Sequence, residues 1–197
     1  MIKIHKNSDK VIIVIHEIYG INQHITDLCE LLSEQYFDVI CPNLLEQEIP
    51  FSYSQEEKAY RNFIDNVAFI NALYKVKNIL SDIKDEYSKI FVIGFSVGAT
   101  VAWMCSEEEY VDGIVGYYGS RIRDFVNISP KCSTLLFFPE VEKSFNVDEL
   151  ISTLDKQNID IHICKGEHGF SDPYSPKYNV ESAQNTFRET LNFFRTN

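Results

Sequence analysis

The sequence has no apolar run long enough to cross a bilayer. Its longest early apolar stretch, residues 11–15, is far shorter than the roughly 20 residues that a membrane helix needs. The N-terminus also lacks the apolar core and the small-residue cleavage site of a signal peptide. We therefore expect no membrane contact and a cytoplasmic location.

Paired cysteines and metal motifs are missing as well. The 5 cysteines are scattered, odd in number and never spaced as C-x-x-C, which favours a reducing compartment over a disulfide framework. No H-E-x-x-H segment or zinc-type cysteine pair occurs, and no predicted strand is followed by G-x-G-x-x-G. We expect no metal and no organic cofactor.

Basic residues are scarce: 18 Lys and Arg against 29 Asp and Glu give a net charge of -11, without a sustained basic cluster. This charge repels a phosphate backbone, so we expect no nucleic-acid partner. The apolar share of 45% is ordinary for a globular protein, and 197 residues fit one domain spanning residues 1–197. The sequence does not fix the oligomeric state.

Strand and helix patterns alternate along the chain. Continuous β-branched runs such as residues 11–15 are typical of parallel strands buried on both faces. The pattern predicts a mostly parallel sheet with helices on both faces, which is an α/β fold. Further strands are predicted at 2–5, 37–41, 89–93, 113–118, 134–138 (ended by Pro139) and 159–164, and helices at 23–36, 56–85 with a break near 75–78, 97–107, 147–157 and 180–194.

Residues 94–98, G-F-S-V-G, form the motif that points most directly to chemistry. They follow a strand pattern and precede a helical one, which is the context of a nucleophile elbow, where a serine on a sharp turn stands above the sheet edge. Gly94 and Gly98 suit this turn because a side chain at either position would crowd the strand against the helix. Three fixed letters also recur by chance, so Ser96 needs partners elsewhere in the chain.

A nucleophilic serine requires a base, and in this type of site the histidine follows the serine and the acid in the chain. Of the two histidines after Ser96, His162 alternates with isoleucines inside a predicted strand. His168 lies in a loop beyond a strand's carboxyl end, where the sites of open α/β sheets are found. We predict His168 as the base.

Several residues in the loop after the strand 134–138 are candidates for the acid that orients the histidine. Glu142 lies far enough into the loop to turn back toward His168, while Glu140 is closer to the strand end. Asp148 stands where a helix is predicted to begin, a position that the helix dipole alone favours for an acid. We predict Glu142, with Glu140 as its main rival and a solvated acidic loop as the alternative.

Acyl transfer also needs N–H donors for the oxyanion, one directly after the nucleophile and one from the loop after a central strand. These are Val97 and, within residues 16–20 (H-E-I-Y-G), Ile18. Glu17 is then a partly desolvated charge at the mouth of the site, or an acceptor that holds the loop. Residues 43–55 have no clear period and predict a long loop near the site.

Together these residues resemble the dienelactone hydrolase family from about residue 11 to residue 194. Residues 16–20 are similar to its Q/H-E-[IVW]-[FWY]-G oxyanion loop, and residues 94–99 to its G-[FY]-C-x-G-G elbow. Residues 117–119 match a Y-Y-G after the next strand, and residues 168–170 resemble the H-[GS]-F segment that carries the catalytic histidine. The resemblance implies an α/β-hydrolase fold and a hydrolase without metal or organic cofactor.

The resemblance also bears on individual residues. It supports Glu142, which falls where members carry G-x-x-D, and it implies that Glu17, Tyr19 and Tyr118 contact the substrate. Longer members have more N-terminal strands, so a trimmed sheet is expected.

Two departures from the family concern the substrate. Members that open dienelactones use a cysteine nucleophile, activated with help from the oxyanion-loop glutamate, where this chain has Ser96. They also hold the lactone carboxylate with an arginine two residues after H-S-F, where this chain has Asp172, which would repel an anion. Arg61 is an arginine whose place the sequence does not fix.

We therefore predict a serine hydrolase of small, uncharged or cationic esters or lactones, rather than a true dienelactone hydrolase. One alternative is a non-catalytic binding or regulatory protein on a degenerate hydrolase fold, motivated by the departures at Glu142 and Asp172. Another is a thioesterase or a peptidase. The natural substrate is not encoded in these motifs.

Overall fold

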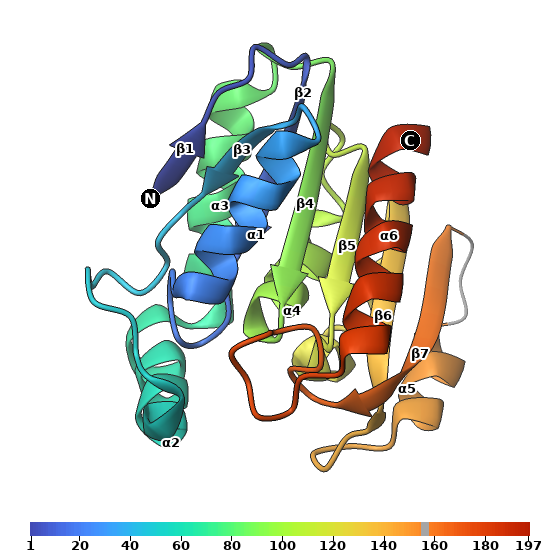
Figure 1. Ribbon diagram of the computed structural model, residues 1–197. Helices are drawn as coiled ribbons and strands as arrows, with labels where there is room; N and C mark the ends of the chain where they lie inside the picture. The colour runs from blue at the N-terminus through green and yellow to red at the C-terminus, as the bar shows by residue number, and fades with distance from the viewer. Residues whose placement is uncertain (155–157) are drawn as a thin grey trace.

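The computed structural model describes residues 1–154 and 158–197. Within them, seven strands form one sheet in the order β1-β3-β2-β4-β5-β6-β7, in which only the β1–β3 pair is antiparallel. This confirms the predicted mostly parallel sheet, with β1 as an antiparallel edge (Figure 1). The strands are β1 Ile2–Ile4, β2 Lys10–Ile15, β3 Asp38–Cys41, β4 Lys89–Phe95, β5 Gly113–Tyr117, β6 Ser133–Val141 and β7 Ile159–Glu167.

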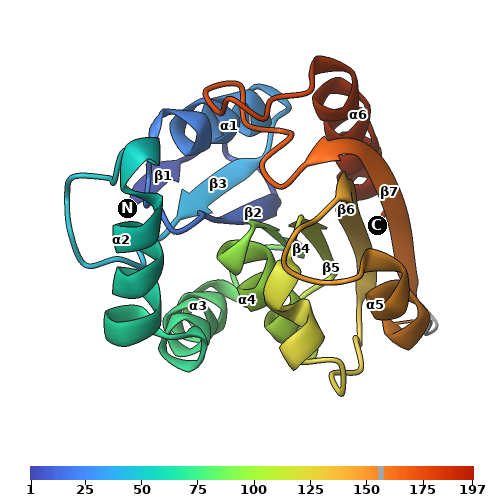
Figure 2. The same cartoon turned by 90° about the horizontal axis from the view of Figure 1, so that it is seen from below.

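Helices cover both faces of this sheet (Figures 1 and 2). Side chains of α1 and α6 share an apolar cluster with Ile12 and Val14, and those of α3 and α4 share one with Val11 and Ile13. Alternate residues of β2 thus face opposite helix layers, which is why the strand is apolar throughout. The α-helices are α1 Gln23–Glu34, α2 Glu56–Asn62, α3 Phe69–Ile83, α4 Val97–Cys105, α5 Val147–Leu154 and α6 Val180–Thr196, with 3-10 turns at Tyr53–Gln55 and Ser120–Asp124.

The long helix predicted over residues 56–85 is interrupted, but the break near residues 75–78 is wrong. A π-helical turn at Phe63–Val67 leads into Ala68, which has φ 59° and ψ 153° and ends the helix. The π-helical turn changes the helical phase, and Ile70, shortly after it, is 49% exposed. The segment before Ala68 can therefore point in a different direction from α3.

Strands β6 and β7 run farther than predicted. Pro139 does not end β6, because β5 has already stopped at Tyr117, opposite Phe137. On the side of β5 there is then no strand that would need an N–H from Pro139. On the other side, β6 stays paired with β7 through a register shift between Pro139 and Val141. Val141 pairs with Glu167 at the end of both strands. The next residues along the two strands therefore start out side by side.

The predicted helix 147–157 ends at Leu154, and its last predicted residues lie outside the described part of the chain. The described helices include none that is both long and apolar enough to cross a membrane.

Candidate active site

Ser96 occupies the sharp turn between β4 and α4. Its φ of 54° and ψ of -115° are unusual for a residue with a side chain, and such a conformation costs about 1–3 kcal/mol. The turn is held from both sides, since the N–H of Ser96 donates to the carbonyl of Tyr117 at 2.9 Å and that of Thr100 donates to the carbonyl of Ser96 at 3.2 Å. The chain therefore has the strained elbow that the motif predicts.

Two glycines make this turn possible by close approach of backbones. A Cβ on Gly94 would overlap the carbonyl group of Gly98, and a Cβ on Gly98 would overlap the carbonyl oxygen of Ile15. Both obstacles are backbone atoms, which cannot turn aside as a flexible side chain can. The glycines let α4 start directly above the ends of β2 and β4.

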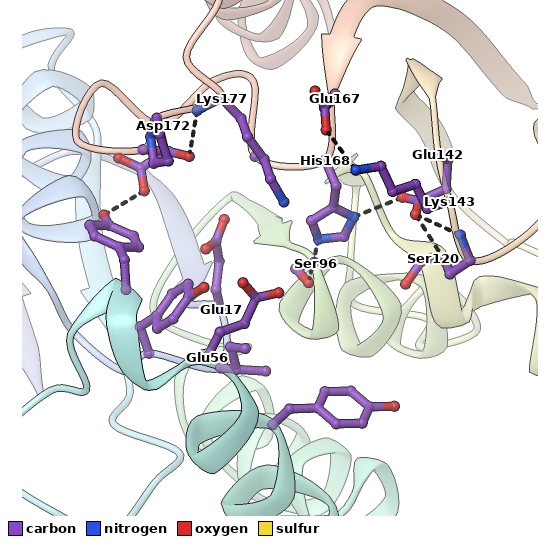
Figure 3. Close-up of a pocket in the computed structure, with 18 of the residues that line it drawn as sticks. Glu17, Glu56, Ser96, Ser120, Glu142, Lys143, Glu167, His168, Asp172 and Lys177 are labelled. Carbon is purple, nitrogen blue, oxygen red and sulfur yellow. Dashed lines mark hydrogen bonds and ion pairs between the residues drawn. The ribbon is translucent and has the colours of Figure 1, made fainter.

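The strand ends bring the three predicted triad residues together. His168 follows β7 and Glu142 follows β6, as the paired strand ends require. The Nε2 of His168 lies 2.9 Å from the hydroxyl of Ser96, and its Nδ1 lies 2.9 Å from Glu142 Oε2 (Figure 3). Glu140 is exposed, and the described structure gives it no bond to His168. The geometry therefore favours Glu142 over its rival.

The charge of Glu142 fixes the direction of these hydrogen bonds. Its side chain is only 7% exposed, and this burial favours the neutral acid. Hydrogen bonds from His168 and Ser144 outweigh burial and lower the pKa of Glu142 to about 2. An ionised carboxylate can only accept, so Nδ1 of His168 donates to it. The Nε2 of the neutral imidazole is then free to accept from the hydroxyl of Ser96.

The loop after β2 is held by a buried histidine. The Nε2 of His16 accepts from the N–H of Leu44 at 3.0 Å, so its Nδ1 carries the proton and donates to the carbonyl of Glu17 at 2.6 Å. Burial lowers the pKa of His16 to about 4, which keeps the ring neutral. Gly20, with φ 89°, closes the loop through its N–H to the same carbonyl. The backbone around Ile18 is thereby fixed.

Glu17 is more buried than the sequence indicates. It is 6% exposed, and its carboxylate accepts from the hydroxyl of Tyr118 at 3.0 Å. Burial raises the pKa of Glu17, which favours the protonated form. Tyr118 is itself fully buried, hydrogen-bonds Ser171 and packs against the ring of His168, with centroids 4.9 Å apart, so it lies behind the residues that line the cavity.

Asp172, which replaces the family's arginine, does not point freely into solvent. It is 1% exposed and accepts from the hydroxyl of Tyr53 at 2.5 Å and from the N–H of Tyr174 at 2.8 Å. The imidazole of His24 lies 3.7 Å away. Asp172 therefore connects the loop after β7 to the 3-10 turn at Tyr53–Gln55 and holds both beside the nucleophile.

These elements enclose a cavity of about 450 Å³. Ser96, His168 and Glu142 line one side of it, together with Glu17, Ile18 and Tyr19. Tyr53, at the end of residues 43–55, and the helix α2 after it form the other side, so this segment approaches the site as predicted. Residues of this second side that the motifs did not indicate are Tyr53, Glu56 and Tyr60, and Lys177 also lines the cavity.

Arg61 does not contribute to the site. Its side chain is 72% exposed and pairs with Glu57 one helical turn earlier, at 2.5 Å. His162 likewise stays a sheet residue, 3.2 Å from both Asp160 and Glu189.

Comparisons with known proteins agree with this architecture. The sequence profile of the "Dienelactone hydrolase family" matches residues 1–197. The chain is 40% identical over 172 residues to the uncharacterized protein YczH of Bacillus subtilis, covering 86% of this chain and 84% of that protein. It is 22% identical over 187 residues to carboxymethylenebutenolidase 1 of Cupriavidus pinatubonensis, covering 87% and 80%.

A solved structure gives the same picture of the fold. The crystal structure of a Klebsiella pneumoniae protein, named as a candidate dienelactone hydrolase, superposes with a TM-score of 0.79 at 19% identity. The superposition covers 95% of this chain and 87% of that one. At this identity the likeness concerns the fold alone.

Proposed function

The chain belongs to the dienelactone hydrolase family of carboxylic-ester hydrolases, and we propose that it cleaves small esters or lactones through a triad of Ser96, His168 and Glu142. One observation carries the proposal: a continuous hydrogen-bond chain runs from the hydroxyl of Ser96 through His168 to Glu142, with 2.9 Å at each step. This is the arrangement by which a base activates a weak nucleophile.

In the first step the hydroxyl oxygen of Ser96 attacks the acyl carbon of the substrate. Its proton passes to Nε2 of His168, and the resulting imidazolium is stabilised by the ionised Glu142. The strained turn favours the attack by Ser96 as well, because it presents the hydroxyl above the sheet edge without further backbone movement.

The attack places a negative charge on the former carbonyl oxygen. We assign its stabilisation to the backbone N–H groups of Val97, directly after the nucleophile, and of Ile18 in the loop held by His16. Fixed N–H donors stabilise a developing charge at no cost of reorganisation. The neutral His16 is therefore a positioning residue for this loop.

Collapse of the tetrahedral intermediate expels the alcohol, which takes its proton from His168 and leaves an acyl group on Ser96. Water then attacks the acyl group, with His168 as base, and the acid product leaves. In this scheme Glu17 and Tyr19 contact the substrate from the cavity wall, while Tyr118 acts on the substrate through its hydrogen bond to Glu17.

The cavity offers a matched pair of serines for the experiment. Ser96→Ala is expected to abolish hydrolysis of p-nitrophenyl acetate and labelling by a fluorophosphonate probe. Ser120 also lines the cavity and has no contact with His168 among the described interactions, so Ser120→Ala is expected to keep both. Turnover that is unchanged in Ser96→Ala would reject the triad and favour a binding protein on a hydrolase fold. A panel of thioesters and peptides separates the thioesterase and peptidase alternatives.

A further inference from the structure

The charges around the cavity are not balanced. Five carboxylates line it, against the two ammonium groups of Lys143 and Lys177. The formal sum is -3 when all of them are ionised, and it stays negative when Glu17 holds a proton. The sign of the charge therefore does not depend on the state of that buried acid. The carboxylates are Glu17, Glu56, Glu142, Glu167 and Asp172.

Most of these carboxylates already have a partner in the protein. Glu142 binds His168, Glu167 lies 3.8 Å from the ammonium of Lys143, and Asp172 accepts from Tyr53. Glu56 differs, since the described part of the chain gives its side chain no hydrogen bond and no ion pair. Figure 3 shows its carboxylate directed into the cavity, toward Ser96.

Aromatic side chains line the same cavity as this free carboxylate. They are Tyr19, Tyr53 and Tyr60, of which Tyr53 and Tyr60 lie three residues before and four residues after Glu56 in the chain. The rings of Tyr19 and Tyr53 pack edge to face, with centroids 4.9 Å apart, and the hydroxyl of Tyr53 is held by Asp172. The face of an aromatic ring attracts cations at exposed sites such as those of Glu56 and Tyr60 as well as at buried ones. A carboxylate among tyrosines combines charge and apolar surface in the way that an organic ammonium group requires.

We infer that Glu56, with Tyr19 and Tyr60, forms a subsite for an organic cation and gives the cavity a preference for esters that carry an ammonium group. The inference rests on the proposed function and adds the substrate class. Glu56 is in this view a specificity-determining residue, because it acts on the part of the substrate away from the ester bond.

Lys177 is the strongest argument for the opposite preference. Figure 3 shows its side chain reaching into the cavity, where its ammonium group could hold an anionic acyl group. An anionic acyl group would, however, also face the carboxylates of the unpaired Glu56 and the buried Glu17. The side chain of Lys177 is exposed and flexible, so it can leave the cavity when a cationic substrate enters.

The experiment compares two esters of equal shape. Acetylcholine and 3,3-dimethylbutyl acetate differ in one atom, nitrogen for carbon, and therefore in charge. We expect kcat/KM for acetylcholine to be about tenfold higher, and the ratio to fall at high ionic strength. Glu56→Gln should bring the ratio close to one. The matched control is Glu57→Gln, at the next residue of α2 after Glu56. It removes an exposed carboxylate that pairs with Arg61, and it should keep the ratio.

Each outcome decides the question. Equal rates for the two esters in the native protein, or a ratio that is the same in Glu56→Gln, would overturn the inference while Ser96-dependent turnover keeps the proposed function. A preference for monoethyl succinate over both of these esters that is lost in Lys177→Gln would assign the cavity to anionic substrates instead.

Where neither acetylcholine nor 3,3-dimethylbutyl acetate is turned over, binding titrations with choline and with 3,3-dimethylbutan-1-ol make the same comparison. Tighter binding of choline that weakens in Glu56→Gln supports the subsite, and equal binding rejects it.

Discussion

The two sides of the cavity are built in different ways. The catalytic wall, Ser96, Glu142 and His168, consists of residues that directly follow strands of one sheet. The helical wall, Tyr53, Glu56 and Tyr60, comes from a 3-10 turn and a helix of seven residues before the interruption at Ala68. The register of parallel strands positions the catalytic wall, whereas the helical wall is held by the hydrogen bond of Tyr53 to Asp172, by its packing on Tyr19, and by the backbone bond from Phe51 to Tyr19 just before it. In the proposed function, chemistry and selectivity therefore depend on different kinds of structure.

The largest effect is expected from the acid of the catalytic wall. Glu142→Gln removes the charge that stabilises the imidazolium of His168, and kcat should fall by about 10²–10⁴-fold with little change in KM. The matched control is Glu140→Gln, two residues earlier and exposed, which should keep wild-type kcat. Steady-state kinetics with p-nitrophenyl acetate measures both. A larger loss in Glu140→Gln would exchange the roles of the two glutamates.

The next effect tests how rigid the catalytic wall is. A methyl group on Gly98 meets the backbone of β2, so Gly98→Ala should destabilise the fold by about 3 kcal/mol and lower activity with it. In Gly113→Ala, the added methyl group meets the rings of Phe193 and Phe91, which are side chains and not backbone, and the loss should be smaller. Urea denaturation compares the two variants. Equal losses would mean that the elbow tolerates adjustment as well as any other site.

A smaller effect is expected on the helical wall. Tyr53→Phe keeps the ring but removes the hydrogen bond to Asp172, the direct bond from this wall to the loop after β7. We expect KM to rise by about threefold to tenfold with kcat nearly constant, because one hydrogen bond to a charged group contributes about 1.5–3 kcal/mol at most. Tyr74→Phe, at a tyrosine that is 61% exposed, is the control. A fall in kcat without a change in KM would show that the helical wall also takes part in the chemical step.

The last effect concerns stability in acid. The pKa of Glu142 lies at about 2 in the folded protein against an ordinary 4.5, so its carboxylate stabilises the fold above pH 4.5. This contribution is lost as the pH falls from about 4.5 through about 2. The free energy of unfolding should therefore decline less steeply in Glu142→Gln than in the native protein over this window. Parallel curves would mean that the pKa of Glu142 is not lowered in the folded state.

The same contrast explains what the sequence could predict. Ser96 was predicted from the G-x-S-x-G motif after an apolar strand pattern, His168 from its place after Ser96 in a loop beyond a predicted strand, and Glu142 from its depth in the loop after the strand 134–138. The structure brings the three side chains together because the ends of parallel strands meet at one edge of the sheet. The ends of β6 and β7 were placed too early, since nothing in the sequence shows that β5 stops before Pro139 and leaves no strand that needs its N–H.

The helical wall was beyond such reasoning. Residues 43–55 were predicted near the site, but the break was placed seven or more residues too late, because an alanine carries no sequence signal for a positive φ. The sequence pattern indicates only that Glu56 is an acidic residue in the first turn of a helix, where the helix dipole favours a negative charge. Its direction toward the cavity depends on how the turn before it packs on Tyr19, which is a tertiary contact.

The interruption at Ala68 has a consequence for how such a protein can diverge. It separates α2, from which Glu56 and Tyr60 line the cavity, from α3, whose buried side chains pack in the core. Substitutions at the cavity-lining positions of α2 can therefore change the shape and charge of the cavity, whereas Ala59, Phe63 and Val67 of the same segment belong to the buried core. An engineer who exchanges residues 43–67 between relatives has to keep these core residues and the N–H of Leu44 that holds His16, while the three residues of the proposed triad lie outside the exchanged segment.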